Sequence, residues 1–138
     1  MPNKEDNSKK KILLVEDDIY MSKALSFKLA QEGFEVRTLF NGENVLAKID
    51  EESFNLFLLD LIMPKVDGWQ VLKDIHYRHI TTPVMVVSNL GQPEDIERAR
   101  ELGAVEYFVK SVSSLSDIAE TIKNFFNPLS LKLQRTKK

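Results

Sequence analysis

The stretch Phe54-Asn55-Leu56-Phe57-Leu58-Leu59-Asp60-Leu61-Ile62-Met63-Pro64 decides the fold. Its apolar run from Leu56 to Leu59 is short and bounded by polar and turn-forming residues, which is typical of a strand buried on both faces. The run delivers a carboxylate, Asp60, at its C-terminal end. An unpaired buried carboxylate is costly, and open parallel α/β sheets bind ligands at the carboxyl ends of their strands. Asp60 is therefore a candidate for chemistry; the alternative, equally supported by this stretch alone, is an Asp that caps the next turn or helix.

Length and composition indicate a single soluble domain. The chain has 138 residues, 43% hydrophobic and 29% charged, which suits one globular domain with a sizeable core. The absence of cysteine excludes disulfides, thiolate metal sites and a thiol nucleophile. Residues 1–11 lack the apolar segment of a signal peptide, and no apolar run is long enough for a membrane span. We therefore expect a cytoplasmic protein that does not bind membranes.

Charge is spread unevenly along the chain. The formal net charge is −2; residues 1–11 carry +2 and residues 129–138 carry +4, which leaves −8 on residues 12–128. An acidic body argues against nucleic-acid binding by the domain itself. We expect a disordered N-terminal tail at 1–10, a domain at 11–127, and a basic C-terminal tail or linker at 128–138. The leucines at 129, 131 and 133 could instead form an edge strand or a partner-binding segment.

Strand-like and helix-like segments alternate from residue 11 onward. The predicted strands are 11–15, 34–39, 56–59, 83–87 and 105–109. The predicted helices are 19–32, a short one around 45–49, 69–75, 93–102, and one from Ser116-Asp117 to Pro128 with Ser116 or Asp117 as its N-cap. This order predicts an α/β fold with a parallel sheet, right-handed crossovers and helices on both faces.

Polar residues end four of the five predicted strands. They are Glu16 and Asp17, Asp60, Ser88, and Lys110. These ends share one edge of a parallel sheet, where the carboxylates would repel one another unless a cation neutralised them. Mg²⁺ prefers such oxygen ligands, and Lys110 and Ser88 suit an anionic oxygen. The set favours phosphoryl transfer with Asp60 as the nucleophile. Taken singly, Glu16 or Asp18 could serve a helix N-terminus, Lys110 a surface ion pair, and Ser88 a loop cap.

With these residues in place, the chain resembles the receiver domain of two-component response regulators over about residues 11–127. Five separated blocks carry the resemblance: Ile12-Leu13-Leu14-Val15-Glu16-Asp17-Asp18, Leu59-Asp60-Leu61-Ile62-Met63-Pro64 with Asp67-Gly68, Ser88, Gly103-Ala104, and Tyr107-Phe108-Val109-Lys110. The resemblance implies a flavodoxin-like (βα)5 doubly wound parallel sheet of strand order 2-1-3-4-5. It also implies that a histidine kinase or phosphotransfer protein donates a phosphoryl group to Asp60.

The resemblance further assigns roles to individual residues. Mg²⁺ would sit on Asp17, Asp60 and the backbone carbonyl of Ile62, with Glu16 acting through water, and Lys110 would hold a phosphoryl oxygen. Ser88 and Tyr107 match the family's switch pair, which biases the surface of the fourth helix, fifth strand and fifth helix. That surface would control a downstream partner or fused output domain, and could form a phosphorylation-dependent homodimer.

The chain departs from the family pattern near the site. Ser111 stands where the family usually has Pro after the lysine, and Asn89 stands where a small residue is usual. Ile62 and Leu90, which in this family flank the route of the hydrolytic water, are both apolar. Neither can hydrogen-bond that water, so we predict slow self-dephosphorylation and a long-lived signal.

Two other functions compete with a phosphorylation-driven switch. A phosphatase with an aspartyl-phosphate intermediate commonly has a second acid, the general acid, two residues after its nucleophile. This chain has Ile62 at that position, which argues against a phosphatase. A phosphate-independent interaction module would not need the full set of acids, serine and lysine. Elsewhere, we expect His76 and His79 on a solvated surface rather than in a metal site, and Trp69 as a packing residue.

Overall fold

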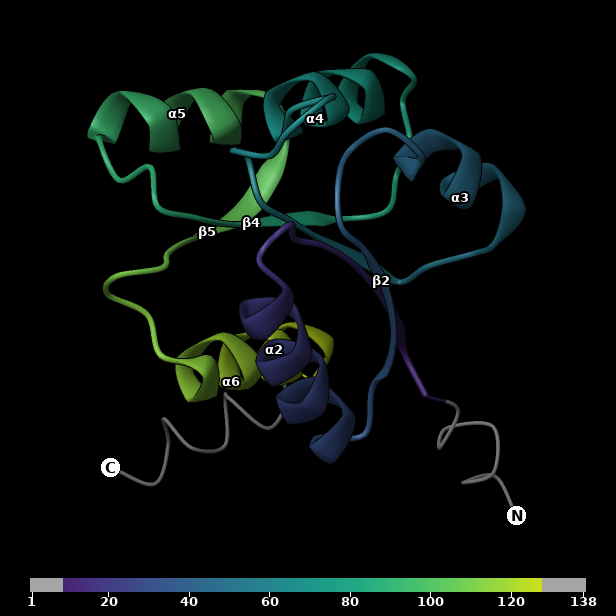
Figure 1. Ribbon diagram of the computed structural model, residues 1–138, viewed down its shortest axis with the longest axis vertical. Helices are drawn as coiled ribbons and strands as arrows, with labels where there is room; N and C mark the ends of the chain where they lie inside the picture. The colour runs from purple at the N-terminus through teal and green to yellow at the C-terminus, as the bar shows by residue number, and fades with distance from the viewer. Residues whose placement is uncertain (1–8, 128–138) are drawn as a thin grey trace.

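The computed structural model describes residues 9–127, which form five strands and five helices (Figure 1). In chain order they are β1 (Lys11–Val15), α2 (Ile19–Gln31), β2 (Glu35–Leu39), α3 (Val45–Glu51), β3 (Leu56–Leu59), α4 (Gly68–Tyr77), β4 (Val84–Ser88), α5 (Pro93–Glu101), β5 (Ala104–Val109) and α6 (Leu115–Phe126). The predicted N-terminal tail, apart from residues 9 and 10, and the predicted basic tail at 128–138 lie outside the described residues.

The five strands form one parallel sheet of order β2-β1-β3-β4-β5. This confirms the predicted flavodoxin-like order. β3 lies at the centre, and all four of its residues are buried. Each such side chain contributes about 1.5–3 kcal/mol when it is fully buried, so residues 56–59 form the middle of the hydrophobic core.

Alternate strand residues face two separate cores, as strand geometry requires. Figure 1 shows α3, α4 and α5 over one face of the sheet, and α2 and α6 over the other. Leu13 and Leu59 belong to the first core, which Val71 and Ile75 of α4 complete. The second core includes residues from β1, β3, α2 and α6: Ile12, Leu14, Leu25, Leu29, Leu56, Leu58, Ile118 and Ile122.

Most element boundaries fall within one or two residues of the prediction, and one N-cap was predicted wrongly. α6 begins at Leu115, and its N-cap is Ser114 rather than Ser116 or Asp117. Ser114 Oγ accepts a hydrogen bond from the Asp117 amide at 3.0 Å, and the Asp117 carboxylate accepts one from the Ser114 amide at 3.1 Å. This reciprocal capping box satisfies two backbone donors at once, whereas either predicted cap would satisfy fewer.

Asp67 and Gly68 do more than form the turn that the sequence suggests. Asp67 is the N-cap of α4, and its carboxylate accepts a hydrogen bond from the Gln70 amide at 3.0 Å. Gly68 packs directly against the backbone of Asp60 and Leu61, so that a Cβ atom there would overlap the Asp60 carbonyl oxygen. The loop after β3 is therefore held tightly beside Asp60. No helix between residues 9 and 127 is long and apolar enough to span a membrane.

Candidate phosphoacceptor site

The register of the sheet brings the predicted polar residues to one edge. Val15 and Leu59 are paired, so the next residues, Glu16 and Asp60, lie side by side. The Asp60 amide donates to the Val15 carbonyl at 3.0 Å, which continues the ladder past the end of β3. On the other side, the Lys110 amide donates to the Ser88 carbonyl at 2.9 Å. The ends of β1, β3, β4 and β5 thus surround Asp60, as the parallel sheet predicts.

Lys110 connects the two buried carboxylates. Its Nζ lies 2.8 Å from Glu16 Oε1 and 3.0 Å from Asp60 Oδ2. Glu16 is 1% exposed and Asp60 is 3% exposed, so both charges are largely removed from water. A buried carboxylate needs a counter-charge or hydrogen bonds. Asp60 has both, because its Oδ1 also accepts a hydrogen bond from the Ile62 amide at 3.2 Å.

Burial and ion pairing have opposing effects on the pKa of Glu16 and on that of Lys110, and the net result is a raised pKa for both residues. Burial raises the pKa of Glu16 from 4.5 to about 7, and the neighbouring Asp60 carboxylate adds to the rise while Lys110 opposes it. Burial alone would lower the pKa of Lys110, but its hydrogen bonds to Glu16 and Asp60 raise it above the usual value. The lysine therefore stays charged at neutral pH, and Glu16 is poised to gain or lose a proton.

A third carboxylate, Asp17, completes a group that could hold a metal ion. One oxygen from each of Glu16, Asp17 and Asp60 lies within 4.8 Å of the other two. The neighbouring Asp18 has a different role: its Oδ1 caps α2, accepting from the Tyr20 amide at 3.0 Å and from the Met21 amide at 3.2 Å. The helix-capping alternative therefore holds for Asp18, while Asp17 is left exposed beside the cluster.

The cluster opens into a surface cavity of about 290 Å³. It is lined by Asp17, Asp18, Asp60, Ile62, Asn89 and Lys110. A cavity of this size admits a phosphoryl group together with an ion and water. All donors toward a cation are oxygens, which suits a hard divalent ion such as Mg²⁺ better than a softer metal.

Ser88 and Tyr107 meet at the backbone of Leu90. Ser88 is fully buried, and its Oγ accepts a hydrogen bond from the Leu90 amide at 3.2 Å. The Tyr107 hydroxyl donates to the Leu90 carbonyl at 2.7 Å. The two residues of the predicted switch pair are thus joined through one peptide segment. Sequence reasoning identified both side chains but not this backbone link, which no side-chain pattern reports.

The remaining predicted residues lie around this site or on other surfaces. Ile62 is 53% exposed at the cavity, Asn89 is exposed beside it, and Leu90 is half-buried. His76 and His79 are exposed, as expected. Trp69, in the first turn of α4, is partly buried against the first core, and the Arg98 guanidinium lies 4.4 Å from the centre of its ring.

Comparison with known proteins agrees with this geometry. The family model for the response regulator receiver domain matches residues 12–123. The transcriptional regulatory protein CiaR of Streptococcus pneumoniae is 38% identical over 72% of this chain and 44% of its own length. CrdR of Helicobacter pylori is 35% identical over 86% of this chain and 55% of its own length. The chain thus spans about half the length of the curated relatives it matches.

Solved structures give the same result. A CheY-like response regulator receiver domain protein from Methanospirillum hungatei superposes with a TM-score of 0.79 at 29% identity, covering 91% of this chain and 99% of that one. The response regulator DrrB of Thermotoga maritima superposes with a TM-score of 0.77 at 29% identity, covering 87% of this chain and 54% of that one. Since the family model covers most of the residues and the structural matches share the fold, the chain belongs to the response regulator receiver domains of two-component systems.

Proposed function

We propose that Asp60 accepts a phosphoryl group from the phosphohistidine of a sensor histidine kinase or phosphotransfer protein. The observation that carries this proposal is the setting of Asp60: a carboxylate 3% exposed, bonded to Lys110 at 3.0 Å, within a cluster of acids that opens into a cavity. The product is an aspartyl phosphate, and the chain acts as a switch rather than as a multiple-turnover enzyme.

The transfer requires little covalent chemistry from the protein. A carboxylate oxygen of Asp60 forms the new O–P bond, the N–P bond of phosphohistidine breaks, and the imidazole leaves with a proton from solvent. Lys110 Nζ, already 3.0 Å from Asp60 Oδ2, offsets the charge that accumulates on the phosphoryl oxygens. The Ser88 hydroxyl supplies a further donor to one of these oxygens.

A divalent cation, Mg²⁺, fits the donor set. Asp17, Asp60 and the carbonyl oxygen of Ile62 would bind it directly, and Glu16 would act through water. When bound, the ion neutralises the surplus negative charge and favours the approach of an anionic phosphodonor. Lys110 alone cannot do this, since it is one cation facing three carboxylates.

The link through Leu90 supports a specific route from phosphorylation to a distant surface. A phosphoryl group on Asp60 draws the Ser88 hydroxyl toward it, and Ser88 Oγ then releases the Leu90 amide that it accepts at 3.2 Å. Leu90 also carries the carbonyl that anchors Tyr107. A shift of this segment therefore moves Tyr107 and biases the surface of α5, β5 and α6, an instance of a local charge event acting on a two-state element.

Ile62, Asn89 and Leu90 tune the lifetime of the phosphorylated state. Ile62 and Asn89 line the cavity, and the apolar side chains of Ile62 and Leu90 offer no hydrogen bond to an attacking water. We expect loss of phosphate from the isolated protein over minutes or longer. Polar substitutions at Ile62 and Leu90 together should shorten this time, and a half-life of seconds in the unsubstituted protein would contradict the idea.

The remaining roles follow from the same proposal. The receiver domain, residues 11–127, works in the cytoplasm, with residues 128–138 as a basic tail or linker. Its output passes from the α5–β5–α6 surface to a downstream protein or fused output domain, and a phosphorylation-dependent homodimer forms through that surface. The acidic body binds neither nucleic acid nor membrane.

Labelling with a small phosphodonor tests the proposal. The full chain is incubated with ³²P-labelled acetyl phosphate, with Mg²⁺ or with EDTA, and compared with Asp60→Asn. The matched control is Asp50→Asn, an exposed carboxylate on α3. We expect a stoichiometric label that requires Mg²⁺ and Asp60 but not Asp50. Multiple turnover would indicate a phosphatase instead, and absence of label would indicate a phosphate-independent module.

A further inference from the structure

Trp69 and Arg98 join two neighbouring helices, α4 and α5, on the same face of the sheet (Figure 1). Trp69 lies in the first turn of α4, and its ring is partly buried against the first core. The Arg98 guanidinium lies over this ring, 4.4 Å from its centre, which is within the range of a cation–π contact. Trp69 is the one tryptophan of the chain, so the tryptophan fluorescence of the protein reports on this residue alone.

Arg98 lies over the ring although two acids are within reach along its own helix. Glu94, four residues earlier, and Glu101, three residues later, stand at the spacings at which helical ion pairs form. The salt bridges of the described residues nevertheless do not include Arg98. Its placement therefore indicates a specific contact with the aromatic ring, on which a planar guanidinium stacks well.

One partner of this contact is fixed to the phosphoacceptor. Gly68, the residue before Trp69, packs so closely on the Asp60 carbonyl that a Cβ atom would overlap it, and its amide donates to the Leu61 carbonyl at 2.9 Å. Four of the ten residues of α4 are buried. The backbone at Trp69 therefore cannot move away from Asp60 without disrupting close packing.

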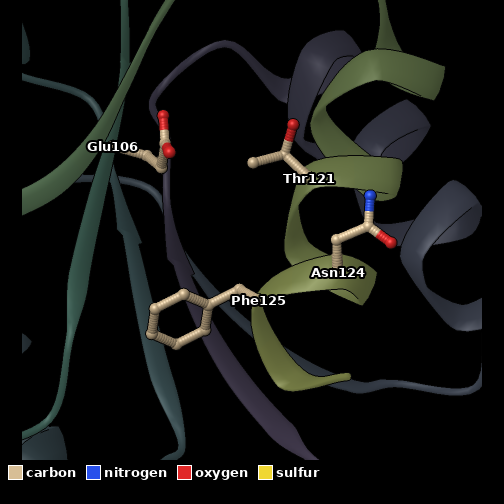
Figure 2. A pocket seen from close by; sticks show the side chains of 4 residues that line it. All are labelled: Glu106, Thr121, Asn124 and Phe125. Atoms are coloured by element: carbon tan, nitrogen blue, oxygen red, sulfur yellow. The ribbon is translucent and has the colours of Figure 1, made fainter. Parts of the chain in front are cut away.

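The other partner lies on a helix with few buried residues. Of the nine residues of α5, one, Ala99, is buried. α5 packs on β5, while α6 covers the opposite face of the sheet (Figure 1). Figure 2 shows that the space between Glu106 of β5 and Thr121 of α6 is open, and this cavity has a volume of about 250 Å³. The contact with Trp69 therefore supplies a substantial part of what holds α5 in place.

The start of α5 is joined directly to the segment that is expected to respond to phosphorylation. Two residues separate Leu90, whose amide donates to Ser88 Oγ at 3.2 Å, from Pro93, the first residue of α5. Under the proposed function, a phosphoryl group on Asp60 breaks that hydrogen bond, so the shift of Leu90 displaces the N-terminus of α5. Arg98 follows about 7.5 Å further along the helix axis and moves with it.

We propose that the Arg98–Trp69 contact stabilises one of two positions of α5 and breaks when Asp60 is phosphorylated. The stabilised position is the one that accompanies the Ser88–Leu90 hydrogen bond. This inference rests on the function proposed above and adds a regulatory contact to it. Because the contact favours one position, it opposes phosphorylation, and by linkage its removal favours binding of a phosphoryl group. A cation–π contact at an exposed site corresponds to a factor of about 2 to 5 in that equilibrium.

Acrylamide quenching of Trp69 fluorescence in the full chain tests the inference. The guanidinium covers one face of the ring, so Arg98→Ala should raise the quenching constant of the free protein. Arg100→Ala, the same change at an exposed position of α5, should not. Mg²⁺ with beryllofluoride, a phosphoryl analogue, should raise the wild-type constant toward the Arg98→Ala value. The same addition should leave the constants of Arg98→Ala and of Asp60→Asn unchanged.

Binding of beryllofluoride, followed separately by ¹⁹F NMR, distinguishes failure of this inference from failure of the proposed function. If no binding that depends on Asp60 is detected, the proposed function fails, and the inference fails with it. If beryllofluoride binds but the quenching constant of the wild type does not change, the inference alone is overturned. A change of equal size in Arg98→Ala would also overturn it, because the ring would then respond to something other than the guanidinium.

A double-mutant cycle on beryllofluoride affinity measures the coupling. Arg98→Ala should bind about 2- to 5-fold more tightly than the wild type, and Arg98→Lys, which keeps the charge but not the planar group, should lie between them. Loss of a positive charge alone would weaken binding of an anion, so Arg100→Ala should not tighten it. Arg98→Ala should have no effect in a Trp69→Leu background, whatever Trp69→Leu does alone. Tightening that persists in that background, or that Arg100→Ala reproduces, would overturn the inference.

Discussion

Replacing Lys110 by Met isolates the electrostatic role of this residue. Met keeps an unbranched apolar stem and removes the ammonium group. Among the described residues, no other lysine or arginine pairs with Glu16 or Asp60. The two carboxylates, whose side chains are 1% and 4% exposed, would then face each other without a counter-charge. The variant should therefore be less stable than the wild type in the absence of divalent cations.

The size of the effect depends on pH. Removing one partner of a buried ion pair costs about 3–5 kcal/mol, because the other charge stays buried. Glu16 can escape part of this cost by taking up a proton. Its pKa is already raised to about 7 by burial, and loss of Lys110, which lowers that pKa, raises it further. We expect a loss of about 3–4 kcal/mol at pH 8 and about 1–2 kcal/mol at pH 6.

The sign follows from proton counting. Between the unfolded pKa near 4.5 and the raised folded pKa, the folded variant binds more protons than the unfolded chain, so its stability falls as pH rises. Urea unfolding in EDTA, followed by circular dichroism at pH 6 and pH 8, measures the two differences. Adding Asp60→Asn to the variant removes one of the facing charges and should recover part of the loss at pH 8.

Lys28→Met provides the matched control. Lys28 lies 3.8 Å from Glu32 on the surface of α2, so its loss should change the free energy of unfolding little at either pH. A loss below about 1 kcal/mol for Lys110→Met at both pH values would refute the reasoning. A loss of equal size at pH 6 and pH 8 would show that packing of the lysine stem, rather than its charge, stabilises the site.

Three further predictions concern stability. Gly68→Ala should cost about 3 kcal/mol in urea unfolding, because its Cβ meets rigid backbone, whereas Gly91→Ala meets only a side chain that can shift and should cost less. In EDTA, the wild type should lose stability relative to Glu16→Gln as pH rises from 4.5 to about 7, because folded Glu16 holds its proton through that range; a flat difference would contradict the raised pKa. Tyr107→Phe should cost about 1 kcal/mol by removing a 2.7 Å hydrogen bond, while exposed Tyr77→Phe should cost nothing measurable.

Sequence alone was sufficient for the fold and for the residues at the sheet edge, for one physical reason. A parallel sheet buried on both faces needs continuous apolar strands, so a charged residue after such a run is conspicuous. Asp60 is found this way, after the fully buried β3, and Lys110 follows the shorter apolar run Tyr107-Phe108-Val109 at the end of an edge strand. The same parallel geometry places all strand ends at one edge, and neighbours along that edge then follow from the strand order.

What sequence could not provide depends on backbone positions that residue types do not report. The proximity of Gly68 to the Asp60 carbonyl arises from the path of the loop after β3. Ser114 was missed as the N-cap of α6 because three candidate caps, at 114, 116 and 117, lie within one turn. The path of the chain after β5 decides which of them is the cap. The Val112 and Ser113 amides donate hydrogen bonds to the Val109 carbonyl, each at 2.9 Å, so a turn precedes the helix and α6 begins after Ser114.

The charge balance of the site connects these observations. The site holds three carboxylates, those of Glu16, Asp17 and Asp60, but one lysine, Lys110. Glu16 and Asp60 are buried at the end of an apolar sheet, where water does not solvate their charges. Burial raises the pKa of Glu16 to about 7, and the Asp60 carboxylate adds to the rise. A proton on Glu16 therefore relieves part of this surplus in the free protein. A bound divalent cation would relieve it instead, and Glu16 should then release its proton. Under the proposed function, cation binding near pH 7 is therefore coupled to proton release from Glu16, and should tighten as pH rises.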